Sequence, residues 1–346
     1  MKKFHKWVFF FIGLVIVVTV LITKPYYQFV TRTLKVSPVS ALLSLDGLKS
    51  FDNQVNFVLL GIAGGSHDGP NLSDSITVAS YNLKTNKLST VSLPRDIWSD
   101  TLDDKINSAY AYGEAKKPGT GGLILAKAET SSVVGLPIQY GAVIDFDHFK
   151  ELINFLGGVD INVEKTFTDK KYPITGKEND KCNGDKEYKC RYETITFNKG
   201  ETSMDGETAL KFVRSRYSES EEGTDFAREQ RQQKVIEAVK NKLVSLVKTP
   251  NIKKYGELYA ILDQIVKRDI SNQQVAIIIK KILFNKKFSQ QKITLIEDMF
   301  INPPISDKYN GAWVLISKDN NFSIIHQYIK CYLKNGADCE KLKNKG

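Results

Sequence analysis

Apolar and polar residues alternate in short runs along the first half of the chain, a pattern typical of half-buried strands. Five runs rich in β-branched and aromatic residues predict strands, at Phe57–Ile62, Ile76–Tyr81, Leu88–Leu93, Gln139–Ile144 and Val159–Val163. Turn residues at 82–86 separate the second run from the third, so we expect these two strands to form a hairpin.

Apolar residues at helical spacing predict helices at Gly122–Val134, Phe146–Phe155 and Phe322–Leu333, with two more helical patterns after Asn251. Thr224 or Asp225 is expected to cap a long helix that runs to about Val247. A short helix at Asp205–Lys211 should lead into a strand at Phe212–Arg216, and another strand is expected near Lys292–Ile296. This order predicts an α/β fold with a mixed central sheet flanked by helices.

The longest apolar run, Trp7–Ile22, lies near the short end of what spans a bilayer as a helix. Three lysines and no acidic residue precede it, so the positive-inside rule leaves the N-terminus in the cytoplasm. A cleaved signal peptide is the alternative, but Leu21–Tyr27 lacks the small residues that cleavage requires. We therefore expect a single-pass type II protein of the cell membrane.

In this arrangement residues 1–6 form a cytoplasmic tail, 7–23 a transmembrane helix, 24–50 a juxtamembrane linker and 51–346 an extracytoplasmic domain. Residues 165–196 are polar and rich in lysine, so we expect a surface insertion without chemistry. Residues 251–346 are expected to be a helical C-terminal part of the same domain, because no internal repeat or composition break sets them apart.

All four cysteines follow the apolar run, at Cys182, Cys190, Cys331 and Cys339. An even number of cysteines suits an oxidising compartment, and two disulfides that close local loops are the favoured interpretation. A metal site is the alternative, although the chain has no C-x-x-C motif or nearby pair of histidines. The pairing of the cysteines stays open.

The net charge of +10 is carried mostly by scattered lysines. No zinc-finger spacing or repeated basic-aromatic pattern is present, and the domain is expected outside a membrane, so we do not expect nucleic acid as a partner. Anionic lipid headgroups, pyrophosphate or anionic wall polymers suit this charge better.

Four of the eight arginines fall between Arg214 and Arg231. Arginine grips phosphate or carboxylate with a planar fork of donors, so a cluster in a lysine-rich chain predicts an oxyanion-binding site. Arg214 and Arg216 would share one face of a strand, and Arg228, Arg231 and Gln232 one face of a helix. A network of ion pairs with the nearby acidic residues is the alternative.

Six segments in this order resemble the LytR-CpsA-Psr family of bacterial envelope proteins: Leu59–Ile62, Leu72–Ser75, Ser92–Asp96, Lys105–Tyr110, Phe212–Arg216 and Asp225–Gln233. The match runs from about residue 55 to residue 240. The resemblance implies a sheet flanked by helices, with an apolar pocket for a lipid tail. It also implies a phosphotransferase that moves a glycopolymer from a polyprenyl-pyrophosphate carrier to peptidoglycan with the help of a divalent metal, expected to be Mg²⁺.

The resemblance also assigns roles to residues of this chain. It implies pyrophosphate contacts at Arg95, Arg214, Arg216, Arg228, Arg231 and Gln232, and catalytic roles for Arg95, Arg216, Arg228 and Asp74. It implies supporting roles for Lys105 and Asn107. Because Arg95 follows an apolar strand and Pro94 fixes the turn, its side chain should project into a cleft. A surface pair with Asp96 is the alternative for Arg95.

Asp74 matches the aspartate that holds magnesium or activates the acceptor hydroxyl in that family, although a turn or capping role is the alternative. Family members commonly carry a second metal aspartate where this chain has Ala63, and an arginine where it has Leu72. Asp68 or His67, in the following loop, is the candidate to compensate, although an aspartate before glycine more often serves a turn. Two other functions stay open: a polyprenyl-pyrophosphate phosphatase, and a regulatory protein that binds polyprenyl phosphate without turnover.

Overall fold

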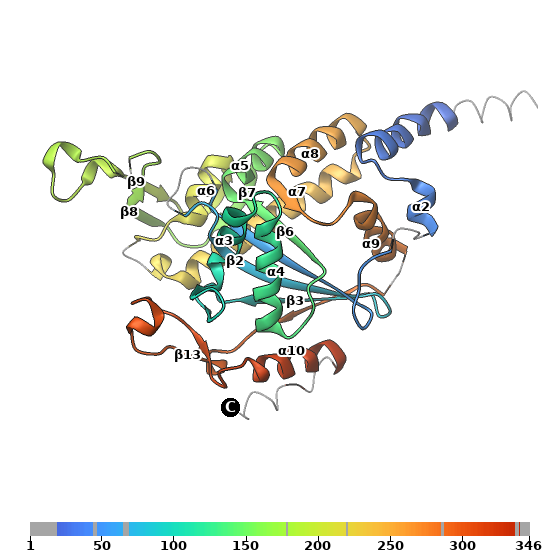
Figure 1. Cartoon of the computed structure of the whole chain (residues 1–346). Coiled ribbons are helices and arrows are strands. Elements are labelled where there is room, and N and C mark those ends of the chain that lie inside the picture. The colour runs from blue at the N-terminus through green and yellow to red at the C-terminus, as the bar shows by residue number, and fades with distance from the viewer. Residues whose placement is uncertain are drawn as a thin grey trace, which may run out of the picture.

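A six-stranded sheet lies at the centre of the computed structural model, which describes residues 19–43, 47–64, 69–177, 179–218, 221–284, 287–335 and 339 (Figure 1). Its strand order is β11–β6–β1–β2–β3–β12. The strands are β1 (Gln54–Ile62), β2 (Ser73–Asn82), β3 (Lys87–Leu93), β6 (Tyr140–Asp145), β11 (Val266–Arg268) and β12 (Ser289–Ile293). Since β1 is antiparallel to β2 and parallel to β6, the predicted mixed sheet is confirmed.

The predicted hairpin is confirmed by β2 and β3, which pair in antiparallel fashion from Ile76 with Leu93 to Asn82 with Lys87. The Asn82 side chain accepts hydrogen bonds from two backbone N–H groups of the turn, at 2.9 Å each. Asn86 adopts a φ of 56°, a conformation that asparagine tolerates better than most residues. Local turn chemistry therefore fixes the register of these strands.

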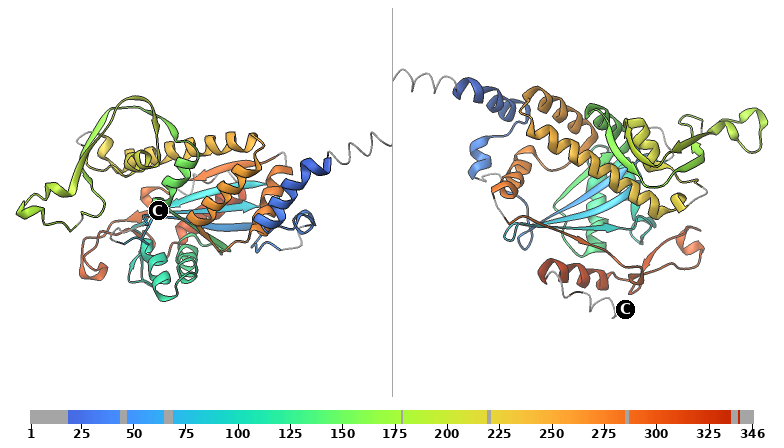
Figure 2. Two further views of the ribbon diagram at one scale, coloured as in Figure 1. Left: turned by 90° about the horizontal axis from the view of Figure 1, so that it is seen from above. Right: turned by 180° about the vertical axis from the view of Figure 1, so that it is seen from behind.

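Helices cover both faces of the sheet. Figure 1 shows α4 (Gly121–Val134) in front of it, and the rear view in Figure 2 shows α7 (Asp225–Lys248) and α8 (Ile252–Ile265) on the opposite side. The front face also carries α3 (Ala109–Lys116) and α10 (Ser323–Asn335), whose buried side chains pack with Val58, Leu60 and Ile62 of β1. These alternate residues of β1 follow the period of two that a sheet requires.

A second core lies among α5 (Phe146–Phe155), α6 (Gly206–Arg214), α7 and a two-stranded sheet of β7 (Val159–Val163) and β10 (Gly200–Met204). The rings of Phe167, Phe197 and Phe212 contact one another in this core, with centroids 5.1 to 6.0 Å apart. This core anchors the arginine-rich segment, because Phe212 belongs to it.

The strand predicted at Phe212–Arg216 is wrong. α6 continues to Arg214, after Asp205 caps its first turn by accepting a hydrogen bond from the Thr208 N–H at 2.8 Å. Ala209, Phe212 and Val213 lie at helical spacing and pack into the second core, so the helix gains apolar burial by extending through them. Arg214 and Arg216 therefore do not share a strand face.

The region predicted as a surface insertion forms a two-stranded arm of β8 (Phe167–Pro173) and β9 (Tyr192–Phe197), which projects from the body in Figure 2. Disulfides join Cys182 with Cys190 and Cys331 with Cys339, each pair eight residues apart. The prediction of two local disulfides is confirmed. Asp180 lies beside the first pair, but those cysteines are bonded to each other and are not metal ligands.

The C-terminal part, predicted as helical, includes α8, α9 (Asn272–Phe284) and α10. It also supplies β11 and β12, the two edge strands of the central sheet, and the small pair β13 (Phe300–Ile301) and β14 (Ile316–Ser317). Another short pair, β4 (Trp98–Ser99) and β5 (Asp104–Lys105), follows β3.

Residues 7–18 of the predicted transmembrane helix lie outside the described residues, and residues 19–28 are helical. Within the described ranges, no helix has both the length and the apolar character that crossing a membrane requires. The expected linker is folded in its described part, as η1 (Phe29–Thr33) and α2 (Pro38–Leu43). The Phe29 ring contacts Tyr255 of α8, and Ser37 and Gln273 of α9 exchange hydrogen bonds.

Candidate functional site

The candidate residues Asp74, Arg95 and Arg214 meet at one end of the central sheet. There β1, β6 and β3 reach their carboxyl ends and the antiparallel β2 begins. Ile62, near the end of β1, lies between Ser73 of β2 and Asp145 of β6. Loops that leave one end of an α/β sheet commonly build binding sites.

Asp74 stands at a β-bulge. Gly61 pairs with Ser75 and Ile62 pairs with Ser73, so Asp74 is the extra residue on β2. Bulges redirect side chains and are over-represented next to active sites. The Asp74 side chain is 40% exposed, and its carboxylate accepts a hydrogen bond from Nη1 of Arg95 at 2.5 Å. Asp74 is thus more than a turn residue, because it forms a charge pair with a second candidate.

Arg95 belongs to a chain of alternating charges. Its Nε lies 3.7 Å from Asp96, whose other carboxylate oxygen accepts a hydrogen bond from Lys105 at 2.7 Å. The Arg95 carbonyl accepts from the Asn107 N–H at 3.3 Å, which joins the two supporting candidates to the same loop. The alternative pairing with Asp96 is therefore present, but the contact with Asp74 is shorter. Asp96 itself was not among the predicted site residues.

Arg214 reaches the same end of the sheet from α6. Its Nη2 donates a hydrogen bond to the carbonyl of Ala63 at 3.0 Å, directly after β1. Gly64 follows with a φ of +68°, and a Cβ there would collide with the Asp145 carboxylate. Asp145 was not predicted as a site residue. Its Oδ2 lies 3.1 Å from Nδ1 of His148.

The segment after α6 is held by Asp169, which is fully buried on the arm strand β8. One carboxylate oxygen accepts three hydrogen bonds, from Oγ of Ser215 at 2.8 Å, from the Arg216 N–H at 3.0 Å and from the Tyr217 N–H at 3.1 Å. The Arg216 side chain is exposed while its backbone is fixed. The segment expected to be a surface insertion without chemistry thus also fixes the backbone beside a candidate residue, which the sequence analysis did not foresee.

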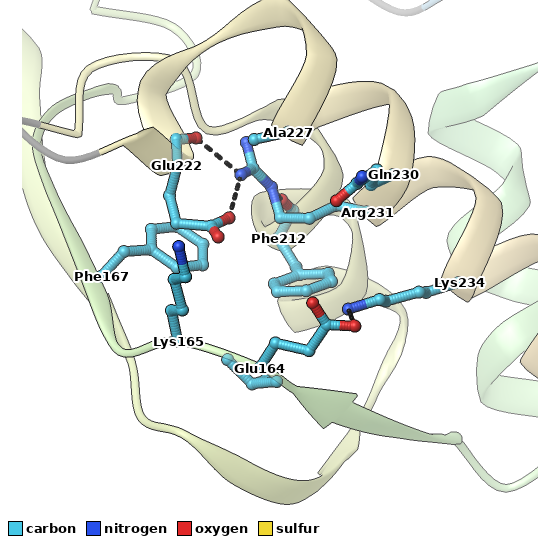
Figure 3. Close-up of a pocket in the computed structure, with 10 residues that line it drawn as sticks. Glu164, Lys165, Phe167, Phe212, Glu222, Ala227, Gln230, Arg231 and Lys234 are labelled. Carbon is cyan, nitrogen blue, oxygen red and sulfur yellow. Dashed lines mark hydrogen bonds and ion pairs between the residues drawn. The ribbon is translucent and has the colours of Figure 1, made fainter.

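Arg231 was predicted to contact pyrophosphate, but the structure buries its guanidinium, with only 3% of the side chain exposed. It donates to the carbonyls of Phe212 at 2.8 Å and Ser215 at 2.7 Å. It also donates to the carbonyl of Glu222 at 2.7 Å and to the Glu222 carboxylate at 3.0 Å, as Figure 3 shows. Its guanidinium carbon also lies 4.9 Å from the centre of the Phe167 ring. Burial lowers the pKa of Arg231, while Glu222 opposes this shift.

This geometry corrects the prediction for Arg231, because most of its donors are spent on carbonyls of its own chain. The buried guanidinium holds the backbone at Phe212, Ser215 and Glu222. The cavity beside it is small and is lined partly by Lys165, Glu164 and Lys234, with an ion pair of 2.8 Å between the last two (Figure 3). Arg231 binds backbone carbonyls of the arginine-rich segment, and Asp169 binds its backbone N–H groups.

α7 begins at Asp225 and carries the last arginines of the arginine-rich segment. The Thr224 side chain caps it by accepting from the Ala227 N–H at 3.2 Å, as predicted. Arg228 lies in the first turn and Gln232 one turn later, both half-buried and on one helix face. The predicted shared face of Arg228 and Gln232 is thus present, whereas Arg231 points to the buried side.

Asp74 fits one requirement of a Mg²⁺ site, an exposed carboxylate oxygen donor. Among the residues that the structure describes, this carboxylate contacts only Arg95, through one of its oxygens. Mg²⁺ in phosphoryl-transfer sites is commonly held by one or two carboxylates together with substrate phosphates and water. Ala63 offers no carboxylate, and Asp68 lies outside the described residues.

An open apolar surface lies on the sheet face opposite the first core. Leu59, in the middle of β1, is 38% exposed, although a central strand usually buries such a side chain. Its cross-strand neighbours Thr77 and Ala142 are only half-buried. Ile236 and Val244 of α7, on the same side of the sheet, are 60% and 46% exposed.

Comparison with known proteins identifies the family and the fold. The model of the LytR_cpsA_psr family matches residues 28–329. Polyisoprenyl-teichoic acid–peptidoglycan teichoic acid transferase TagU of Bacillus mycoides (strain KBAB4) is 28% identical over 284 residues, which cover 79% of this chain and 81% of the relative. The protein of the same name from Oceanobacillus iheyensis is 27% identical over 348 residues and covers 96% of both chains. The crystal structure of TagV from B. subtilis has the same fold, with a TM-score of 0.53 at 22% identity, covering 82% of this chain and 98% of TagV.

Proposed function

Because the chain belongs to the LytR-CpsA-Psr family, we propose that it transfers a glycopolymer from a polyprenyl-pyrophosphate carrier to peptidoglycan. Two relatives are named as transferases of teichoic acid to peptidoglycan, which supports this class of reaction. The observation that carries the proposal is the meeting of Asp74, Arg95 and Arg214 at one end of the sheet.

The arginines suit a pyrophosphate because phosphoryl transfer depends mainly on positioning and on neutralising charge over phosphate oxygens. Arg95 uses one of its five N–H groups on Asp74 and retains others for a ligand. The exposed Arg216 and the half-buried Arg228 stand in the adjoining segments. In this proposal Arg95, Arg214, Arg216, Arg228 and Gln232 bind and orient the diphosphate.

The acceptor hydroxyl oxygen of peptidoglycan attacks the phosphorus that carries the glycan. The bond from that phosphorus to the bridging oxygen breaks, and polyprenyl phosphate leaves. In this proposal Asp74 accepts the hydroxyl proton, after Arg95 exchanges its hydrogen bond to Asp74 for one to the phosphate. Lys105 and Asn107 hold the Arg95 loop in place through Asp96 and the Arg95 carbonyl.

Asp74 would also hold Mg²⁺, with Asp68 as the second candidate ligand. When bound, the ion supplies further neutralisation of phosphate charge. The open apolar surface around Leu59 offers room for the prenyl chain beside the diphosphate site, because its exposed side chains gain favourable free energy on burial.

We also propose that the domain works outside the cell membrane, held by a transmembrane helix at 7–23 in a single-pass type II arrangement. The apolar run with its basic flank supports this placement. Two disulfides support it too, since they persist in an oxidising compartment.

A transfer assay tests the proposal. The full chain in detergent is incubated with a lipid-linked glycan, Mg²⁺ and peptidoglycan oligomers, and the linked product is measured. We expect transfer to fall about 100-fold in Arg95→Ala, since an oxyanion-binding donor typically contributes about 10²–10³ to turnover. Arg191→Ala, on the distal arm, is the control and should transfer normally.

The same assay separates the two other functions. Release of inorganic phosphate that is unaffected by the acceptor would identify a phosphatase. Binding of the lipid without turnover at any divalent ion would identify a regulatory binding protein. Either result would reject transfer.

A further inference from the structure

We propose that α2 and α9 form a second membrane contact, which docks the folded domain on the headgroup layer of an anionic bilayer. The inference rests on the membrane placement in the proposed function and goes beyond it. It concerns a surface of the folded domain, separate from the apolar run at the N-terminus.

Large apolar side chains are exposed together on these two helices. Val39, Leu42 and Leu43 of α2 are 65%, 69% and 61% exposed, and Ile279 and Phe284 of α9 are 49% and 83% exposed. Contiguous exposed apolar side chains mark interaction sites rather than ordinary surface. We name these five residues the α2–α9 patch.

The two helices are held together as one surface. The Ser37 N–H donates to the Gln273 side chain at 2.8 Å, and Lys280 donates to the Leu42 carbonyl at 2.7 Å. Phe284 lies one helical turn beyond Lys280, so it shares the face of α9 that meets α2. The patch is therefore a preformed feature, and docking does not require the two helices to be brought together.

Charge favours a bilayer as the occupant. The sequence has no acidic residue between 1 and 45 and none between 270 and 296, the two segments that build the patch and its surroundings. Lys24, Arg32, Lys35, Lys281 and Lys287 lie on the described parts of these segments. Apolar side chains flanked mostly by basic residues are typical of surfaces that lie in the interface of an anionic membrane.

The patch is also continuous with the segment expected to enter the membrane. Figures 1 and 2 show the helix of residues 19–28, α2 and α9 gathered at one end of the molecule. On that helix Val20, Leu21 and Ile22 are 54% to 65% exposed, and Tyr27 is 62% exposed. Tyrosine is enriched at the boundary between hydrocarbon and water, so the headgroup layer would lie level with the patch.

Docking through the patch would determine on which side of the domain, relative to the bilayer, the candidate site lies. Val275 and Ile278 of α9 pack near Val55, at the start of β1, whereas Ala63 follows the other end of that strand. β1 has nine residues, so its two ends lie about 26 Å apart at roughly 3.3 Å per residue. The bilayer contact and the diphosphate site therefore lie at opposite ends of the sheet.

The test places a tryptophan in the patch. Full-length Phe284→Trp is reconstituted in vesicles of phosphatidylcholine and phosphatidylglycerol, with or without brominated acyl chains, and its emission is compared with that of the parent chain. We expect the added emission to shift to the blue and to lose most of its intensity to brominated lipid. Tyr188→Trp, on the distal arm, is the matched control and should be unquenched.

Quenching of Phe284→Trp should be weaker in vesicles of phosphatidylcholine alone than in vesicles that also contain phosphatidylglycerol. Adding Lys281→Glu should remove this difference between the two kinds of vesicle. Unquenched Phe284→Trp, equal quenching at the control, or a blue shift that depends on protein concentration and not on bromine would overturn the docking proposal. A concentration-dependent shift would indicate a second copy of the chain on the patch. Transfer is measured in detergent on the same protein, so a failure of docking is distinguishable from a failure of the proposed function.

Discussion

Arg231 and Arg216 belong to one cluster of arginines, but their surroundings assign them different tasks. The side chain of Arg231 is 3% exposed and donates four hydrogen bonds within its own chain. The side chain of Arg216 is exposed, while its backbone N–H is held by Asp169. We therefore assign stability to the first residue and ligand binding to the second.

Arg231→Met should lower the free energy of unfolding by about 3 kcal/mol, because it leaves buried carbonyls and the Glu222 carboxylate without their donor. Arg216→Met should change it by about 0.5 kcal/mol at most, as expected for an exposed side chain. Urea denaturation of the two variants measures the difference. Equal stability of the two proteins would show that the Arg231 contacts contribute nothing to the fold.

Asp169→Asn should weaken diphosphate binding without removing any ligand-binding group. The amide keeps the shape of the side chain but loses the charge that accepts three hydrogen bonds at one oxygen, each to a segment that carries Arg216. We expect the KM for the lipid-linked substrate to rise about fivefold to tenfold, since about 1 kcal/mol or more of positioning is lost.

The kcat of Asp169→Asn should change less than its KM. Arg216→Lys should raise the KM as well, by a smaller factor. A loss of protein stability with an unchanged KM would contradict the positioning role of Asp169.

At the scale of elements, short apolar runs predicted β1, β2, β3, β6 and β7 well. Burial alternates along β3 and β7, and β1, β2 and β6 are central strands with consecutive buried residues. The end of α6 was missed because Phe212 and Val213 also suit a strand, and only packing against the second core decides between the two periods. β11, with three residues, is too short to carry a clear pattern.

The hydrogen bonds that Asp169 and Arg231 make to the arginine-rich segment were also missed. Asp169 lies far from that segment in the sequence. Asp169 lies 46 residues from Ser215, in a polar, lysine-rich stretch. One signal was available: Asp169 shares the strand face of the buried Phe167, two residues earlier. Burial of Arg231 also had a signal, because Val235 and Val239, four and eight residues later, mark the apolar side of the same helix.

The two disulfides offer a matched comparison of elements, because both close loops of the same length. Cys331 belongs to α10, whose Ile325 and Tyr328 lie in the first core, whereas Cys182 and Cys190 lie on the projecting arm. The double Cys→Ser variant at 331 and 339 should lose about 2.5 kcal/mol of global stability in the chain-entropy model.

The double variant at 182 and 190 should lose much less global stability and should instead speed amide hydrogen exchange within residues 174–191. Denaturation and hydrogen exchange measured on both proteins check this. Equal global losses would mean that the arm unfolds together with the core.

Tyr110, buried on α3, gives the fold a predictable alkaline limit. Burial, followed by the charges of Glu114 and Asp145, raises its pKa to about 12. Between pH 10 and 12 the unfolded chain loses the phenol proton while the folded chain keeps it, so stability is full below pH 10 and falls as pH rises. This group should account for about 2 to 3 kcal/mol of that fall.

Tyr110→Phe removes this titrating group at nearly constant volume. Its free energy of unfolding, measured by urea denaturation from pH 9 to about 11.5, should therefore decline less steeply than that of the parent. Parallel declines in the two proteins would show that Tyr110 titrates normally.

At the scale of the whole molecule, the sheet separates two surfaces. Its end at Ala63 gathers Asp74, Arg95 and Arg214, and its end at Val55 lies beside α9 and the α2–α9 patch. A domain docked through the patch would present the charged end away from the bilayer. The diphosphate of a lipid-linked donor would reach this end with its prenyl chain lying along the apolar surface around Leu59, between the two ends of β1.

The central claim is that guanidinium groups from separate segments bind one diphosphate. The dissociation constant of geranylgeranyl pyrophosphate, measured by calorimetry on the full chain with Mg²⁺, tests it most directly. We predict that Arg95→Ala, Arg216→Ala and Arg228→Ala each weaken binding about tenfold or more, since a charge-assisted hydrogen bond is worth about 1.5–3 kcal/mol, while Arg191→Ala binds as the parent does. Unchanged binding in all three site variants would contradict the account.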